Sequence, residues 1–125
     1  MTKLTPPPVA TPGESAGDRF ERLVQLMRTL RSPNGCSWDR KQTLETLRPF
    51  VLEEAYEVVA AIDDGDPTAL CDEVGDLLLE AVFVAQISAD QDDFTIADAV
   101  DAINAKLVRR HPHVFGEAGA ADGPP

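Results

Sequence analysis

The chain has 125 residues, 43% of them apolar, which allows one small domain with a packed core. Its net charge of −11 argues against nucleic-acid binding, because that requires clustered Lys and Arg. The longest apolar stretch, residues 77–87, is too short for a membrane span, and the proline-rich start lacks the apolar core of a signal peptide. We therefore expect a cytoplasmic protein in which Cys36 and Cys71 are reduced.

A leader, a helix, a turn and an irregular stretch are predicted, in this order, before the middle of the chain. Residues 1–17 are rich in proline and are predicted to be a disordered leader. A helix is expected over residues 18–31, where apolar side chains recur at heptad-like spacing. A proline–glycine turn at residues 32–35 ends this helix, and an irregular stretch is expected at residues 36–42.

Three more helices are predicted. The second starts at Pro49 and runs to Asp63, where Gly65 ends it. Asp66 caps the third, which runs from residue 67 to residue 88. Thr95 caps the fourth, which Pro112 stops, and residues 117–125 are expected to be a disordered tail. Four helices with short connections predict an all-α, antiparallel bundle over residues 18–116.

The third predicted helix is apolar on nearly all sides between residues 77 and 87. A helix in a monomeric bundle needs only one apolar stripe. We therefore expect a second copy of the chain to cover part of it, giving a homodimer or homotetramer.

Two pairs of acids recur at the same spacing on the second and third helices. Glu54 and Glu57 share one helix face, with Glu53 beside them, and Glu73 and Asp76 repeat the three-residue interval. The short turn between the helices makes them antiparallel neighbours, so the pairs can face each other. Two carboxylates about 5 Å apart repel by roughly 3 kcal/mol at an effective dielectric near 20. Cations would relieve this repulsion, and all-oxygen ligands suit Mg²⁺ or Mn²⁺.

The pattern alone also fits a simpler interpretation. Acids at this spacing are usually a solvated helix face. Here they interleave with apolar residues, precede the most apolar stretch of the chain and have few lysines placed to pair with them, so the whole pattern leaves the two interpretations even. A di-iron site is excluded because it would need Glu-x-x-His motifs, and the only histidines, His111 and His113, follow the last helix.

Three motifs resemble one family. Residues 53–57 (EEAYE) and 73–76 (EVGD) resemble the EExxE…ExxD signature of the MazG family of nucleoside triphosphate pyrophosphohydrolases. Residues 36–43 (CSWDRKQT) resemble its CPWDxxQT segment, and residues 106–115 (KLVRRHPHVF) resemble its KLxRRHPHVF ending. The motifs occur in the family's order over roughly residues 20–116, so the match is specific.

The resemblance implies a fold, an activity and a ligand set. The fold is a helical bundle that assembles through its core helices. The activity is Mg²⁺-dependent cleavage of nucleoside triphosphates between the α- and β-phosphates, for the removal of ordinary or aberrant nucleotides. Glu53 would be a further ligand, or would orient or deprotonate the attacking water. The metal ligands carried over are Glu54, Glu57, Glu73 and Asp76.

Other residues are candidates for substrate binding. Lys106 and Arg110 share one helix face next to Arg109, and they either bind phosphate oxygens or compensate the negative end of the helix dipole. Trp38 either stacks on a base or closes the bundle, and Lys41 is a candidate phosphate contact in the same segment.

The chain also departs from the family pattern, and other functions stay open. Ser37 replaces a usual proline, and Glu80 replaces an expected Gln, so that it either recruits a further cation or binds water. The first alternative function is a narrower pyrophosphatase for dUTP or phosphoribosyl-ATP. The second is a non-catalytic helical module that binds a nucleotide or a protein.

Overall fold

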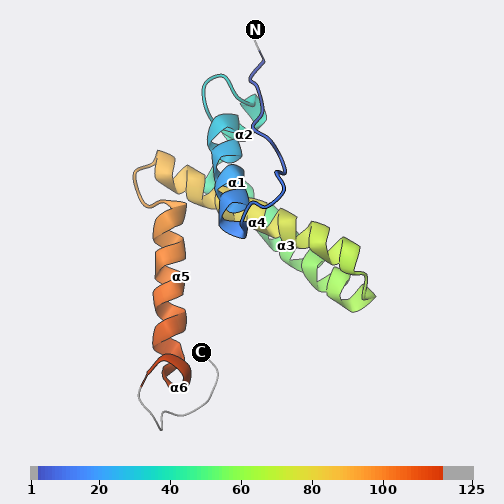
Figure 1. Cartoon of the computed structure of the whole chain (residues 1–125). Helices are drawn as coiled ribbons and strands as arrows, with labels where there is room; N and C mark the ends of the chain where they lie inside the picture. Colours follow the sequence, from blue (N-terminus) through green and yellow to red (C-terminus); the bar gives the residue numbers. More distant parts are fainter. Residues whose placement is uncertain (1–2, 117–125) are drawn as a thin grey trace.

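The computed structural model describes residues 3–116, and this part of the chain contains helices and no strand (Figure 1). The all-α class predicted from the sequence is therefore confirmed. No helix among these residues has the length and apolar character needed to cross a membrane. The helices are α1 (Ala16–Leu30), α2 (Ser37–Lys41), α3 (Leu44–Asp64), α4 (Pro67–Asp90), α5 (Ile96–Arg110) and α6 (Pro112–Phe115).

The long helices α3 and α4 form an antiparallel hairpin (Figure 1). Gly65 ends α3 in the left-handed conformation, at φ 70°, which glycine adopts without steric cost. The carboxylate of Asp66 accepts hydrogen bonds from the backbone N–H groups of Thr68 and Ala69, and Pro67 is the first residue of α4. This tight turn, predicted from the sequence, brings the acidic segments of the two helices side by side.

Several predicted helix boundaries are wrong. Helix α3 begins at Leu44 rather than at Pro49, because Thr43 caps it and Leu47, in its first turn, is buried in the core. Helix α1 begins at Ala16, two residues early, because Ser15 and Asp18 form a capping box. Helix α4 continues two residues past Ser88. The stretch predicted to be irregular contains the short helix α2, and Pro112, which stops α5, also begins α6.

The packed core lies at one end of the hairpin. It is formed by α1, the start of α3 and the second half of α4. On α4 no residue before Val82 is buried, whereas several after it are. The hairpin therefore extends beyond the core on the side of Gly65. The core residues are Val24, Met27, Leu47, Val82, Phe83 and Ile87.

Helix α5 leaves the packed part of the chain. Ile96, at its start, packs against the core, and the helix then extends away from the α3–α4 hairpin (Figure 1). The sequence predicted that this helix packs as the fourth helix of a bundle, whereas within one chain it projects from the other helices as an arm (Figure 1). Its apolar stripe stays exposed, and it consists of Val100, Ile103, Leu107 and Val108.

The segment before α1 is irregular but makes contacts with that helix. Arg22 forms an ion pair with Glu14 at 2.6 Å, and Arg19 donates to the carbonyl oxygens of Glu14 and Thr11. The hydrogen bond from Arg22 lowers the pKa of Glu14 to about 2. The leader predicted to be disordered is therefore tied to α1 near its end. The predicted tail, residues 117–125, lies outside the described residues, as do residues 1–2.

Candidate metal and substrate site

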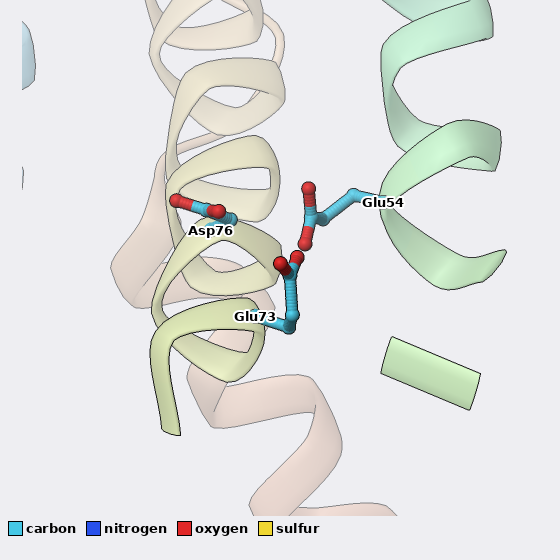
Figure 2. Close-up of side chains that lie close together, drawn as sticks. All are labelled: Glu54, Glu73 and Asp76. Carbon is cyan, nitrogen blue, oxygen red and sulfur yellow. The ribbon is translucent and has the colours of Figure 1, made fainter. Parts of the chain in front are cut away.

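Three of the predicted acids converge between α3 and α4. Glu54 reaches from α3 toward Glu73 and Asp76 on α4 (Figure 2). One carboxylate oxygen from each of the three lies within 4.8 Å of the other two. The three come from two helices joined by the tight turn at Gly65, so the fold of the hairpin alone brings them together.

The other two predicted acids lie on α3 beside this group. Glu57 is one turn after Glu54 and is exposed. Its carboxylate is not among the three that converge, although its charge contributes to raising the pKa of Glu54. Glu53 is also exposed, next to Glu54 in the chain.

The converging carboxylates carry an excess of negative charge. The pKa of Glu54 is raised to about 7, chiefly because its protonated carboxyl can hydrogen-bond to Glu73, and also by burial and by the charges of Glu73, Asp76 and Glu57. Burial, followed by the charges of Asp72 and Glu73, raises the pKa of Asp76. Oε1 of Glu54 is buried and has no hydrogen-bond donor in the described part of the chain. An all-oxygen, electron-rich group of this kind fits a hard divalent cation such as Mg²⁺.

This repulsion predicts how the stability of the metal-free protein varies with pH. The folded chain holds the Glu54 proton up to about pH 7, whereas the unfolded chain loses it near its ordinary pKa of 4.5. Since the folded state binds more protons between these values, stability at this site falls as the pH rises from about 4.5 to about 7. We expect the Glu54→Gln substitution to remove this pH-dependent loss of stability. The unfolding free energy of the variant should therefore increase relative to that of the unsubstituted chain from about pH 4.5 to about pH 7.

Urea unfolding in the presence of a chelator measures this difference. Addition of Mg²⁺ should stabilise the unsubstituted chain more than the Glu54→Gln variant, because a cation relieves the same repulsion. Parallel pH profiles for the two proteins would show that the carboxylates do not interact as described.

A fourth acid extends the group along α4. Glu80 lies one turn after Asp76, and its Oε2 is buried without a hydrogen-bond partner among the described residues. Burial, followed by the charge of Asp76, raises the pKa of Glu80. The extra acid noted in the sequence is therefore on the same helix face as Asp76, and its buried oxygen can accept a hydrogen bond from a bound molecule.

The only tryptophan packs over the seam between α3 and α4. Trp38, on α2, makes edge contacts with Phe50 on α3 and Phe83 on α4, with ring centroids 6.0 and 6.4 Å away. It closes this end of the bundle, and it is still 52% exposed, so it also offers a surface for stacking. Phe50 is one turn before Glu54, and Phe83 is two turns after Asp76. The aromatic and carboxylate groups therefore line the same seam.

The predicted phosphate-binding cations are divided between two places. Lys41 is exposed on α2, in the same helix as Trp38. Lys106, Arg109 and Arg110 lie in the second half of α5, which extends away from the hairpin (Figure 1). They form no ion pair within residues 3–116, and α5 extends away from the two helices that hold the carboxylates (Figure 1). Within one chain they lie at the negative end of the α5 dipole, where they can compensate it, the second of the two roles expected from the sequence.

Comparisons with known proteins agree with the three motifs. The model of a family described as the MazG nucleotide pyrophosphohydrolase domain matches residues 42–115, which include the converging acids and the α5 cations but not Trp38. The chain is 51% identical to the nucleoside triphosphate pyrophosphohydrolase/pyrophosphatase MazG of Thermotoga maritima, over 84% of this chain and 41% of that protein.

Two further relatives carry a similar name. The chain is 46% identical to the nucleoside triphosphate pyrophosphohydrolase of Escherichia coli K12, over 82% of this chain and 40% of that protein. It is 38% identical to the protein of that name from Mycobacterium tuberculosis, over 86% of this chain and 33% of that protein. The chain thus spans about two fifths or less of the length of these relatives.

Proposed function

The chain belongs to the MazG nucleotide pyrophosphohydrolase family, and on this basis we propose that it hydrolyses nucleoside triphosphates between the α- and β-phosphates. The products would be a nucleoside monophosphate and pyrophosphate. The observation that carries the proposal is the convergence of Glu54, Glu73 and Asp76 from the two helices that hold the family's acidic motifs. Cleavage of a phosphate anhydride needs mainly positioning and charge neutralisation, which suits such a site.

The acids have distinct roles in the proposed reaction. Glu54, Glu73 and Asp76 hold Mg²⁺, or Mn²⁺ in its place, and Glu57 completes the set from the same face of α3. When bound, the divalent ion neutralises phosphate oxygens and lowers the pKa of a water molecule. Glu53, exposed beside Glu54, orients the attacking water or accepts its proton.

The groups along the contact between α3 and α4 determine the orientation of the bound nucleotide. The phosphates lie at the carboxylate group, and the base stacks on Trp38 at the aromatic end, since these groups line the same helix faces. Lys41 contacts phosphate or sugar from α2. Glu80 lies between the two ends on α4, where its buried, unpartnered oxygen accepts a hydrogen bond from the nucleoside.

A second copy of the chain is part of the proposal. Apolar side chains are exposed along α3, α4 and α5, including Ile62 at 57% and Val59 at 53%. An apolar groove of about 470 Å³ also lies between Leu44, Val51, Ala55 and Val84. Surfaces of this extent mark protein interfaces. Docking of the α5 arm of one chain along the hairpin of another would cover both apolar surfaces.

The same docking brings opposite charges together. Lys106 and Arg110 of one copy would then bind the phosphates held at the carboxylates of the other copy. We expect light scattering at micromolar concentration to give a dimer or tetramer. A clean monomer would rule out both the apolar docking and the shared site.

The activity is tested with a panel of nucleoside triphosphates. We expect pyrophosphate release that requires Mg²⁺ or Mn²⁺ and stops on chelation. Release of single phosphates would contradict cleavage at the α–β bond. Turnover confined to dUTP or phosphoribosyl-ATP would establish the narrower enzyme. Nucleotide binding without any product would instead favour the non-catalytic module.

A further inference from the structure

We propose that Arg31 is a positioning residue that holds α2, and with it Trp38, against the α3–α4 seam as one wall of the nucleoside site. The inference rests on the proposed function for the role of Trp38 in binding substrate. Its structural part, that one guanidinium anchors α2, is independent of catalysis.

The contacts of Arg31 join three helices. The residue lies at the C-terminal end of α1. Its Nη1 donates to the carbonyl oxygens of Asp39, at 2.5 Å, and Gln42, at 3.2 Å, at the end of α2. Its Nε donates to Asp90 on α4 at 2.9 Å. Asp90 is in turn held by the side-chain amide of Gln86 at 2.9 Å. A single planar group therefore ties the end of α2 to both α1 and α4.

The same guanidinium supports the aromatic cluster. Its central carbon lies 5.9 Å from the centroid of the Phe83 ring, in a cation–π contact. Phe83 in turn contacts the edge of Trp38. Arg31 thus holds α2 in two ways, through the backbone carbonyls at its end and through the ring against which Trp38 packs. Only 11% of the Arg31 side chain is exposed, and these partners compensate its buried charge.

The start of α2 is tied to α1 by a hydrogen bond from the backbone N–H of Cys36 to the carbonyl oxygen of Leu30 at 2.7 Å, and its C-terminal end has few anchors besides Arg31. Helix α2 has five residues, none of them buried, and its N-cap residue makes no side-chain hydrogen bond. Arg40 donates to the carbonyl oxygens of Ser32 and Pro33, within the adjoining turn. The hydrophobic core consists of residues from α1, α3 and α4 only. Loss of the Arg31 side chain should therefore loosen α2 without unfolding the other helices.

Because Arg31 anchors α2, its removal should raise KM more than it lowers kcat. In the Arg31→Ala variant, α2 would occupy the binding-competent position only part of the time, and the apparent affinity falls with that fraction. We expect KM for a nucleoside triphosphate to rise by about tenfold, with a much smaller change in kcat. Arg31→Lys should recover part of the affinity, because one ammonium can pair with Asp90 or donate to the two carbonyls but cannot reach both positions, which Nε and Nη1 of the guanidinium occupy at once.

The single tryptophan supplies a readout that needs no turnover. We expect Arg31→Ala to lower the fluorescence anisotropy of Trp38 and raise its quenching by acrylamide, while circular dichroism retains the helices. Arg28→Ala is the matched control, since Arg28 is exposed one turn earlier on α1 and should change none of these measurements.

The fluorescence measurements test the anchoring of α2, and the kinetic constants test its role in substrate binding. Unchanged Trp38 anisotropy in both Arg31 variants would overturn the anchoring. Altered anisotropy with a lower kcat and an unchanged KM would overturn the role in substrate binding. If the unsubstituted chain hydrolyses no nucleotide, the proposed function fails, and the fluorescence still decides whether Arg31 positions α2.

Discussion

Replacing Asp76 with asparagine should lower kcat/KM for nucleoside triphosphates by at least about a hundredfold and leave the helical fold intact. A bound divalent ion contributes several kcal/mol to the stabilisation of a charged transition state, and each 1.4 kcal/mol is about tenfold in rate. Asp76 is one of the three acids that converge, and its side chain is exposed enough for the amide to replace it without disturbing the core. Hydrolysis is measured as pyrophosphate release at saturating Mg²⁺.

Asp72→Asn is the matched control for this variant. Asp72 lies one turn before Asp76 on α4, and its charge raises the pKa of Asp76, but its carboxylate is outside the converging group. We expect this control to keep most of the activity. Near-normal turnover by Asp76→Asn would show that the ligand assignment is wrong. Equal losses in both variants would point to total negative charge rather than coordination.

Two inactive variants, when mixed, should regain activity if the α5 arm acts on the partner chain. The first is Glu54→Gln, which lacks an acid of the converging group. The second is Lys106→Ala combined with Arg110→Ala, which should lower kcat/KM by at least roughly a hundredfold, because charge-assisted hydrogen bonds contribute about 1.5–3 kcal/mol each. A mixed dimer would hold one site with both defects and one site with none. Random exchange of subunits in a twofold dimer then restores about a quarter of the original sites.

Controls separate this result from its alternatives. If α5 supplied its cations to the carboxylates of its own chain, both sites of a mixed dimer would be defective, and mixing would restore nothing. If the cations only compensated the α5 dipole, their removal would cost about 0.3–1 kcal/mol of stability each and leave kcat/KM unchanged. Arg109→Ala, at the neighbouring position on another side of α5, should have a smaller effect than Arg110→Ala.

The hairpin that carries the carboxylates was predictable because its signals are local. Asp66, Pro67 and Gly65 specify a helix end and a helix start within three residues, and no distant contact competes with them. Once the hairpin forms, helical periodicity brings Glu54 opposite Glu73 and Asp76, whereas the carboxylate of Glu57, at the same three-residue spacing, stays outside the converging group. The convergence therefore needed only helical periodicity and a tight turn.

The surroundings of the site were less predictable because they depend on distant contacts. Helix α2 has no apolar periodicity, and the Arg31 hydrogen bonds that anchor it come from eight and eleven residues earlier in the chain. The Pro49 boundary was wrong because the burial of Leu47 in the core, together with the Thr43 cap, stabilises the helix ahead of a proline that removes one backbone hydrogen bond. The sequence of α5 did not predict that the helix extends away from the hairpin. An amphipathic pattern predicts that one face of a helix is buried, but it does not indicate whether the same chain or another chain buries that face.

Because the core lies at one end of the hairpin, the half of α4 next to Gly65 should open more easily than the half that is packed in the core. Glu73 and Asp76 lie in the half of α4 where no side chain is buried, and nothing but helix propensity and the facing turns of α3 protects its amide groups. Local opening of this half costs less free energy than global unfolding. A cation or a docked partner helix would add the missing interactions there. If a cation and a partner chain bind as proposed, their binding and the local folding of this half would be thermodynamically coupled, and the acids of a single chain would be held less rigidly.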